Sequence, residues 1–504
     1  MSSINWSLIR YIFGVLLLME AFFMGISTLI GVYYHYEAGE QDWLVLLSTT
    51  LVTAVIGYGM LLSSKNFNTH ITTREGFFVV SLAWVVFCLL GMIPFVLSGI
   101  CPSFSSAFLE AMSGFTTTGC TTIIDLESVP HGIMFWRHLM QWLGGLGIVV
   151  ISLALIPLIG AGATQVFSAE TNGLRVDKLR PKIQETARRL WSIYLGLSVL
   201  NAVLYWLGDM SWFDAVCHTF STMASGGFST HSSSIGYFQS SYIEYVCIVF
   251  LFITSVNYNL FYFVGLGYFR LEWKNEELRW FTYFVIGFTL LFMILNYLTA
   301  SGMIGEVQDV SVLGDGSWET CFRTSLFHTL TIISSAGYQA QYFDYVAWGH
   351  VFWIPTLMMM VMGGCSSSTA GGLKVVRFVV LFKNAKQEIF QALNPRSVSA
   401  VRLNGYTLSH NTVFKILAML SIYAILLIVS IFVLQCMGLS FESSIGCAVS
   451  ALGNTGPALD VAGPAFTWAY LPEMAKWYLS FLMLVGRLEI FTVILLLSPT
   501  FWKR

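Results

Sequence analysis

The sequence predicts an all-α polytopic membrane protein, and three observations support this fold class. The chain has 504 residues, of which 56% are hydrophobic and only 10% are charged. Soluble domains usually carry about a quarter of charged residues, so this chain has too few polar groups to cover a water-facing surface. Uncharged stretches of membrane-spanning length recur along the chain, and one short Ser/Thr/Gly pattern appears four times between them.

Ten stretches are long and apolar enough to cross a bilayer, which takes about 20 residues. One of them, Tyr11–Tyr34, contains Glu20 as its single charged residue. The last stretch, Trp477–Trp502, contains Arg487 and Glu489. The other eight contain no Asp, Glu, Lys or Arg: they are Trp43–Leu62, Gly76–Ile100, His138–Ala169, Leu190–Gly208, Tyr245–Phe269, Trp280–Gly305, Tyr345–Leu373 and Ile416–Phe441. We therefore expect ten membrane spans.

The basic residues gather on one side of these spans. All but six of the 25 Lys and Arg residues fall there, including the cluster Arg175–Arg189 and the stretch Lys383–Lys415. Basic residues in short loops mark the cytoplasmic face, so both termini are predicted to be cytoplasmic, which agrees with an even number of spans. Three of the six exceptions are expected on the outer side and three near membrane depth: Arg137, Arg323 and Lys476, then Lys374, Arg377 and Arg487.

Four segments share one pattern, in which a hydroxyl residue stands six places before a glycine. The pairs are Ser113 and Gly119, Ser221 and Gly227, Thr331 and Gly337, and Ser450 and Gly456, and their glycines are 108, 110 and 119 residues apart. A serine followed by an aromatic residue precedes each glycine, by 16 positions at Ser103, Ser211 and Ser440 and by 20 positions at Ser317. Serine is a good helix N-cap, so each segment predicts a helix of about three turns, with one more turn in the third.

Each unit is therefore predicted to contain a span, a short capped helix, a glycine-containing strand and a second span. So short a helix cannot cross the bilayer, and its strand must be buried in protein or line a water-filled cavity. The basic loops place all four re-entrant segments on the outer side. The predicted division is two N-terminal spans in 1–70, followed by pore-loop repeats in 71–170, 171–272, 273–400 and 401–504, the third with a broken second helix.

Four such strands around one axis would suit a dehydrated cation. Backbone carbonyls can replace the hydration shell of the ion, and glycine allows the backbone angles that turn carbonyls inward. The short helices would direct their partially negative C-terminal ends at the central cavity. The competing interpretation is that these are small-residue packing motifs, which are common in membranes. Four clusters at near-equal spacing, each between two spans, favour the pore.

At these residues the chain resembles the Trk/Ktr/HKT superfamily of potassium transporters, specifically its bacterial Trk-type membrane subunits. The likeness covers nearly the whole chain and extends to Trp142–Ile148, Gly363–Gly372 and Gly486–Phe491. In this family the glycine-containing strands form the selectivity filter for the ion. A serine in place of the glycine of the first strand accompanies sodium selectivity in the family, so Gly119 favours potassium. The resemblance implies ion-binding filter positions in all four strands: Thr117, Thr118 and Gly119; Ser225, Gly226 and Gly227; Ser335, Ala336 and Gly337; and Asn454, Thr455 and Gly456.

Two further features are predicted to gate the pore. The run from Gly363 to Gly372 consists of Gly, Ser, Thr, Ala and Cys, which is a poor helix-forming composition. The resemblance implies a pore-obstructing loop here, with its glycines at Gly363, Gly364, Gly371 and Gly372; a packing kink is the alternative. Arg487, near the middle of the last span, is expected at the pore as an electrostatic barrier, with a buried ion pair as the alternative.

Several other residues have simpler expectations. Glu20 should be packed and partnered, while Lys374 and Arg377 should reach toward the cytoplasm. His218 and His328, at equivalent positions of two repeats, should make structural hydrogen bonds. The nine cysteines are expected to be packing residues, because no C-x-x-C motif occurs among them.

We thus expect a potassium-uptake protein of the bacterial inner membrane, with K⁺ as the transported ion, Rb⁺ and Na⁺ as further ions that could bind, and lipid around it. The alternative is a sodium-preferring or weakly selective cation transporter of the same superfamily. Both channel-like conduction and symport with protons or sodium fit the sequence. An enzyme is not expected, since no zinc-protease motif, nucleophile elbow or acidic pair occurs in the spans. No covalent cofactor and no nucleic acid are expected.

The resemblance also implies two protein partners. One is a second copy of the chain, in a homodimer. The other is a cytosolic nucleotide-binding regulatory subunit, which would dock on the basic Arg175–Arg189 loop. The chain itself lacks a P-loop and has no G-x-G-x-x-G motif after a strand.

Overall fold

The computed structural model is mainly helical, which confirms the predicted fold class. It describes residues 4–64, 72–145, 147, 183–258, 260–261, 275–301, 303, 317–341, 344–397 and 400–502. Within this part of the chain, the β-sheet is one antiparallel pair of two-residue strands, β1 (Arg402–Leu403) and β2 (Tyr406–Thr407). The glycine-containing strands of the repeats are irregular segments that belong to no sheet.

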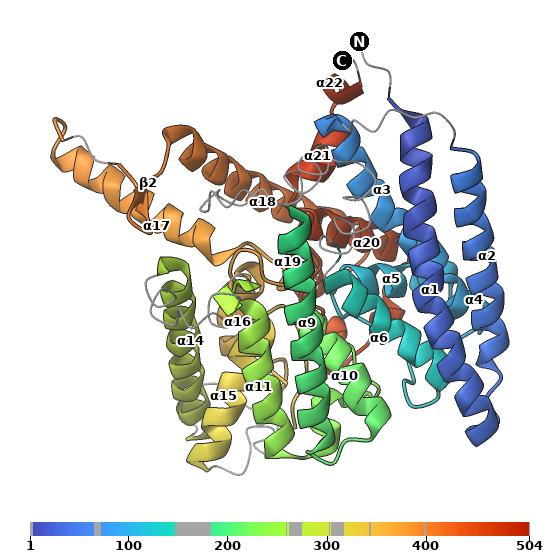
Figure 1. Ribbon diagram of the computed structural model, residues 1–504. Coiled ribbons are helices and arrows are strands. Elements are labelled where there is room, and N and C mark those ends of the chain that lie inside the picture. Colours follow the sequence, from blue (N-terminus) through green and yellow to red (C-terminus); the bar gives the residue numbers. More distant parts are fainter. Residues whose placement is uncertain are drawn as a thin grey trace.

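Two long helices begin the chain, α1 (Trp6–Ala38) and α2 (Asp42–Leu62), and they lie side by side at one edge of the molecule (Figure 1). They approach closely where Gly14 faces Gly57. A Cβ built on Gly14 would lie 2.9 Å from the carbonyl oxygen of Gly57, and the reverse distance is 3.1 Å. Small residues that let two backbones approach are typical of helix pairs in membranes.

The remaining helices follow the predicted order of the repeats. In the first repeat they are α3 (Thr73–Gly91), α4 (Ile93–Leu97), α5 (Phe104–Phe115) and α6 (His131–Gly145). In the second they are α9 (Ile183–Trp206), α10 (Trp212–Ala224) and α11 (Ser241–Ser255). In the third they are α14 (Glu276–Ala300), α15 (Trp318–Ile333), α16 (Trp353–Val361) and α17 (Val375–Leu393).

The fourth repeat contains α18 (His410–Cys436), α19 (Phe441–Gly453), α20 (Glu473–Arg487) and α21 (Phe491–Leu497), and α22 (Pro499–Trp502) follows. Short 3₁₀ helices connect some of these elements: η2 (Ser234–Phe238), η4 (His350–Phe352), η5 (Asp460–Ala462) and η6 (Trp468–Tyr470). In Figure 1 the helices α5 and α20 lie near the centre of the molecule, between the longer helices.

Five helical segments of the described chain are long and apolar enough to cross a membrane: α1, α2, the combined α3 and α4, α14 and α18. The pair α20 and α21 would make a sixth, if a bend of 119° is counted within one span. Parts of two other predicted spans, 148–169 and 262–269, lie outside the described residues, so the total of ten spans stays a prediction.

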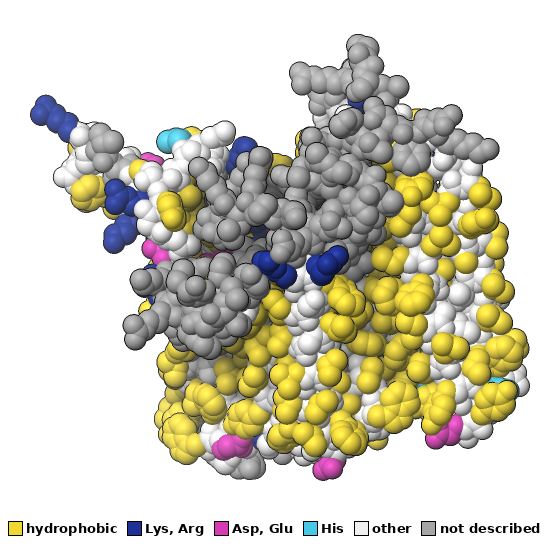
Figure 2. All heavy atoms as spheres, in the orientation of Figure 1, with side chains coloured by type: hydrophobic (Ala, Val, Ile, Leu, Met, Phe, Trp, Pro, Cys, Tyr) yellow, Lys and Arg dark blue, Asp and Glu magenta, His cyan; other side chains and the backbone are white. Residues whose placement is uncertain are grey.

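The surface has the distribution of side chains that a bilayer requires. Figure 2 shows a broad belt of hydrophobic side chains, with Lys and Arg gathered toward one end of the molecule and Asp and Glu at both ends. Large apolar residues such as Leu29 and Val55 are 69% and 70% exposed within this protein surface. Both termini lie at the end where Lys and Arg gather (Figures 1 and 2).

The helical path of the third repeat is interrupted where the sequence predicts it. Helix α16 ends at Val361, and the following residues form a loop before α17 begins at Val375. The two ends of the loop are held together, because Gly363 N–H donates to the Leu373 carbonyl at 2.8 Å and Leu373 N–H donates to the Val361 carbonyl at 3.0 Å. The loop is therefore a closed structural unit at membrane depth.

A second interruption, in the last span, was not predicted. The sequence indicates one continuous stretch, Trp477–Trp502, but α20 and α21 meet at 119°. Glu489 and Ile490 both adopt left-handed backbone angles there, with φ of 56° and 54°. Such angles are unusual for residues other than glycine, especially β-branched ones. The side chain of Glu489 pairs with Arg377 of α17, which ties the break to the neighbouring repeat.

Candidate functional site

The four short helices begin at the serines that the sequence predicts as N-caps. In each case the serine Oγ accepts a hydrogen bond from the backbone N–H three residues later, at 3.0–3.2 Å. Three of the helices, α5, α10 and α19, have 12 or 13 residues, whereas α15 has 16. The additional three or four residues are the extra turn predicted for the third repeat.

Each short helix ends in the same backbone conformation. The first predicted filter residue of each strand is left-handed, with φ of 52–59°: these residues are Thr117, Ser225, Ser335 and Asn454. Two positions later the filter glycine has φ of 72–97°: these are Gly119, Gly227, Gly337 and Gly456. Between them, the N–H of the middle residue donates to the carbonyl of the repeat's hydroxyl residue, at 2.8–3.0 Å. The shared sequence pattern thus encodes a shared turn.

The four strands form a closed ring. A Cβ built on each filter glycine would strike the carbonyl oxygen of the middle residue in the next strand. The distances are 1.9 Å from Gly119 to Gly226 O, 1.6 Å from Gly227 to Ala336 O, 2.1 Å from Gly337 to Thr455 O and 2.6 Å from Gly456 to Thr118 O. Since the fourth strand packs on the first, the repeats surround one axis in sequence order. The structure therefore brings all twelve predicted filter residues together.

This ring lies in the protein interior. The first two residues of every strand are buried, as is Gly456, and the other three glycines are partly exposed. The C-terminal ends of the four short helices lead directly into the strands, so their partially negative carbonyl ends lie beside the ring. Such an arrangement can coordinate a cation through backbone oxygens without any side-chain carboxylate.

The intramembrane loop contacts the inner end of three strands. Gly371 N–H donates to Ser335 Oγ at 2.5 Å, and Thr369 Oγ1 is hydrogen-bonded to Ser225 Oγ at 2.9 Å. A Cβ built on Gly371 would lie 2.9 Å from the Cβ of Asn454. Each of these three partners is the first filter residue of its strand. The loop therefore lies directly beneath the second, third and fourth strands.

Arg487 connects this loop to the first repeat. Its Nη1 donates to the Thr369 carbonyl at 3.0 Å, and its Nη2 donates to the Gly144 carbonyl at 2.7 Å. Gly144 is itself packed on the end of α5, because a Cβ there would lie 1.9 Å from the Phe115 carbonyl oxygen. The guanidinium thus lies beside the loop, below the ring, and its role as a barrier at the pore stays a prediction.

One predicted orientation of side chains is wrong. Lys374 and Arg377 do not extend to the cytoplasmic surface. The Lys374 ammonium donates to the Ala370 carbonyl, and Arg377 pairs with Glu489. Carbonyls of the irregular loop and a carboxylate at the helix break supply partners at membrane depth, so the two cations do not need to reach water.

The three cations expected on the outer side are also buried. Arg137 binds Glu110 at 2.7 Å, and Arg323 binds Glu244 at 3.2 Å. Lys476 donates to Ser106 Oγ at 2.9 Å. Each of the three side chains connects a short capped helix to a neighbouring helix: α5 to α6, α15 to α11 and α5 to α20. They hold the short helices in place instead of facing solvent.

The expectation for the histidines is confirmed, and the expectation for the cysteines holds for the buried ones. His218 is hydrogen-bonded to Ser229 Oγ at 2.9 Å, and His328 to Thr356 Oγ1 at 3.0 Å. All nine cysteines are free, and seven of them are buried. The basic stretch predicted to dock a regulator lies largely outside the described residues.

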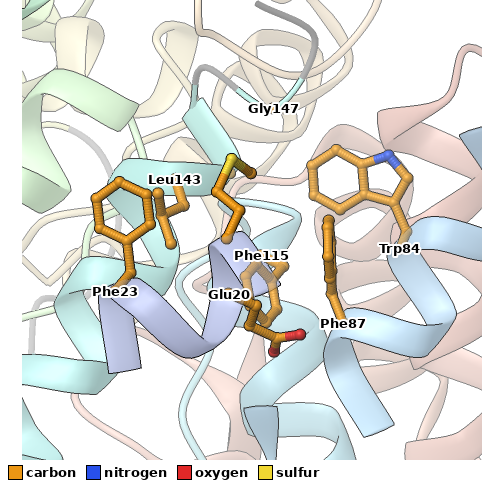
Figure 3. Close-up of a pocket in the computed structure, with 9 residues that line it drawn as sticks. Glu20, Phe23, Trp84, Phe87, Phe115, Leu143 and Gly147 are labelled. Atoms are coloured by element: carbon orange, nitrogen blue, oxygen red, sulfur yellow. The ribbon is translucent and has the colours of Figure 1, made fainter. Parts of the chain in front are cut away.

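Glu20 does not have the partner expected for it. It is 2% exposed, and neither of its carboxylate oxygens is hydrogen-bonded to any residue that the structure describes. Figure 3 shows the side chain beside a cavity of about 30 Å³ with apolar walls, between α1, α3 and the ends of α5 and α6. Phe87 and Phe115 line the same cavity. Among the described residues that line this cavity, Glu20 brings the one charged group, and none is a filter residue.

Sequence reasoning missed Glu277, which holds the loop from below. Its carboxylate accepts hydrogen bonds from Ser366 N–H at 2.6 Å and from Ser366 Oγ at 3.0 Å. Glu277 is 7% exposed and lies in the first turn of α14. The available signal was the Glu-Glu pair at the start of an apolar helix, because carboxylates beside a membrane span are costly unless they have partners.

Comparisons with known proteins show the family and the overall fold of the chain. The model of the TrkH family, described as a cation transport protein, matches residues 45–504. The Trk system potassium uptake protein TrkH of Salmonella typhimurium is 35% identical over 501 residues, which cover 98% of this chain and 99% of the relative. The Trk system potassium uptake protein TrkG of Escherichia coli is 31% identical over 467 residues, 92% and 93% of the two chains. The crystal structure of the potassium transporter TrkH from Vibrio parahaemolyticus matches with a TM-score of 0.84, 32% identity and coverage of 98% and 99%.

Proposed function

We propose, since the chain belongs to the TrkH family of cation transport proteins, that it takes up potassium through the ring of four filter strands. It is a bacterial multi-pass membrane protein and a transporter, not an enzyme. The observation that carries the proposal is the closed cycle of contacts in which every filter glycine meets the next strand's carbonyl. A ring of this kind is suited to replacing the hydration shell of one ion at a time.

In this proposal potassium enters from the outer side and exchanges water for backbone carbonyl oxygens. The twelve ring residues supply them, from Thr117–Gly119, Ser225–Gly227, Ser335–Gly337 and Asn454–Gly456. The helix ends beside the ring favour a cation over an anion. Glycine at position 119 leaves the first strand free of the side chain that accompanies sodium preference in the superfamily.

The inner exit would be closed by the loop and Arg487 together. The loop residues Thr369 and Gly371 contact three strands, and Arg487 adds a bond to the first repeat. A fixed positive charge below a narrow ring opposes the passage of a cation, and the low local dielectric strengthens that effect. Opening then requires the loop to leave the inner end of the ring.

The chain would lie in the inner membrane with both termini in the cytoplasm. The location of both termini at the end rich in Lys and Arg supports this orientation (Figures 1 and 2). A homodimer and a cytosolic nucleotide-binding subunit complete the proposed assembly, by similarity to the family.

Flux through the purified chain in liposomes tests this function. Uptake of potassium, rubidium and sodium is compared at equal gradients, with protein-free liposomes as the control. We expect potassium and rubidium to enter faster than sodium. Equal or faster sodium entry would instead support the sodium-preferring or weakly selective alternative.

A further inference from the structure

The four middle carbonyls of the ring are not equivalent. The carbonyl oxygen of Gly226 accepts a hydrogen bond from Gln141 Nε2 at 2.7 Å. For Thr118, Ala336 and Thr455, the described residues place no hydrogen-bond donor on the corresponding oxygen. Each of these oxygens faces the filter glycine of the preceding strand, so the difference lies within the ring itself.

The side-chain amide of Gln141 is hydrogen-bonded to the second strand both before and after its filter glycine, Gly227. Besides donating to Gly226, it accepts a hydrogen bond through Oε1 from Phe228 N–H at 3.1 Å. The contact is close, since a Cβ built on Gly226 would lie 2.5 Å from the Gln141 Cδ. Gln141 is fully buried. One side chain therefore fixes both peptides that flank Gly227.

Arg137 extends this support by one helical turn of α6. Its Nη1 donates to the Ser229 carbonyl at 3.0 Å, and its guanidinium lies 3.5 Å from the centre of the Phe228 ring. Residues four apart on a helix share a face, so α6 presents two polar side chains to one strand. The strand they hold belongs to the second repeat, whereas α6 belongs to the first.

We propose that Gln141 is a positioning residue that sets ion selectivity by holding the Gly226 carbonyl at a fixed angle and moderating its strength as a ligand. Selectivity between potassium and sodium depends on the number and field strength of the coordinating carbonyls. A carbonyl that already accepts an N–H bond binds a cation less strongly, and it cannot rotate to contract around a smaller one. This inference rests on the proposed potassium function.

The test compares two variants with one control. Gln141→Met keeps the size of the side chain and removes both hydrogen bonds. Gln141→Glu keeps an acceptor for Phe228 N–H and replaces the amide donor to the Gly226 carbonyl. The control is Asn296→Leu, because Asn296 is also a buried amide, 4% exposed, whose Nδ2 donates at 3.2 Å to Ser325 Oγ outside the ring.

The readout is the potassium-to-sodium permeability ratio in liposomes, measured beside total flux and thermal stability. A buried hydrogen bond contributes about 1 kcal/mol, so we expect the ratio to fall about fivefold in both Gln141 variants and to stay unchanged in the control. A purely structural role would lower the yield of folded protein without altering the ratio. If both variants fold and keep the wild-type ratio, the inference is wrong. If the wild-type chain itself does not prefer potassium, the proposed function fails first.

Discussion

Arg487 donates a hydrogen bond to the carbonyl oxygen of Thr369 at 3.0 Å, and this bond fastens the intramembrane loop to the helix break of the fourth repeat. The second bond of the same guanidinium, to Gly144, reaches the first repeat. Arg487 thus connects three parts of the molecule: the intramembrane loop, the break between α20 and α21, and the end of α6 beside the first repeat's short helix. Changes at this residue should report directly on how the inner exit is closed.

We expect Arg487→Ala to increase conduction in a correctly inserted protein, because both the positive charge and the two bonds to carbonyls are lost. Arg487→Lys keeps the charge and should retain most of the restriction. Flux in liposomes and thermal stability in detergent are measured on the same preparations. If Arg487 served mainly in a buried ion pair, the alanine variant would lose about 3–5 kcal/mol of stability and gain no flux.

Gly119→Ser should weaken the preference for potassium over sodium. The added Cβ would lie 1.9 Å from the Gly226 carbonyl oxygen, so the ring must deform before the hydroxyl can act as a ligand. Gly196→Ser is the control, because no heavy atom lies within 4 Å of a Cβ at Gly196 of α9. An unchanged permeability ratio in a folded Gly119→Ser protein would contradict the assignment of the filter.

Removal of Ser366–Ser368 from the loop should raise basal flux. These residues lie inside the loop, away from Gly363 and Leu373 at its two ends. The hydrogen bonds of Gly363 and Leu373 that close the loop can therefore persist. The shortened loop cannot keep Thr369 and Gly371 under the strands. Ser367→Gly is the control, since Ser367 is exposed and has a φ of 58° that glycine adopts without strain. Equal flux in the two proteins would exclude a gating role.

Glu277→Leu should also raise basal flux, because it removes the acceptor for both hydrogen bonds from Ser366. Hydrogen bonds to charged groups contribute about 1.5–3 kcal/mol, which is enough to shift a loop between two positions. The matched control is Glu276→Leu, since the neighbouring carboxylate pairs with Lys383 and not with the loop. The gate interpretation requires the two variants to differ in flux at similar stability.

Glu20→Leu should raise thermal stability and leave potassium flux unchanged. Burying a carboxyl group without a hydrogen-bond partner lowers the stability of the folded protein, and leucine suits the apolar cavity better. Glu110→Leu is the comparison, because Glu110 does have a partner. This variant leaves Arg137 buried without its carboxylate and should destabilise the protein by about 3–5 kcal/mol. A drop in flux in Glu20→Leu at normal stability would assign Glu20 a part in transport.

The caps and turns of the ring could be predicted from the sequence because they are local. Ser103 and its three counterparts bind a backbone N–H only three residues away, and each filter glycine lies at a fixed distance from its hydroxyl residue. Four repetitions of that pattern made the pore the best interpretation. The interruption between Gly363 and Gly372 is likewise encoded by composition.

The remaining features depend on partners far away in the sequence. Glu489 and Ile490 carry no local signal for a break, and the pairing of Glu489 with Arg377 joins residues of two different repeats. The directions of Lys374 and Arg377 were wrong for the same reason, since their partners are set by tertiary structure. Gln141 could be noticed only once its amide was seen against the second strand.

The closure of the ring also has a consequence for biosynthesis. Asn454 Nδ2 donates to Thr118 Oγ1 at 3.0 Å, across 336 positions of the chain. The first strand therefore emerges from the ribosome long before the partner that completes its ring. Until the fourth repeat is in place, the first three strands cannot close the ring. The filter can therefore form only after the fourth repeat has been made.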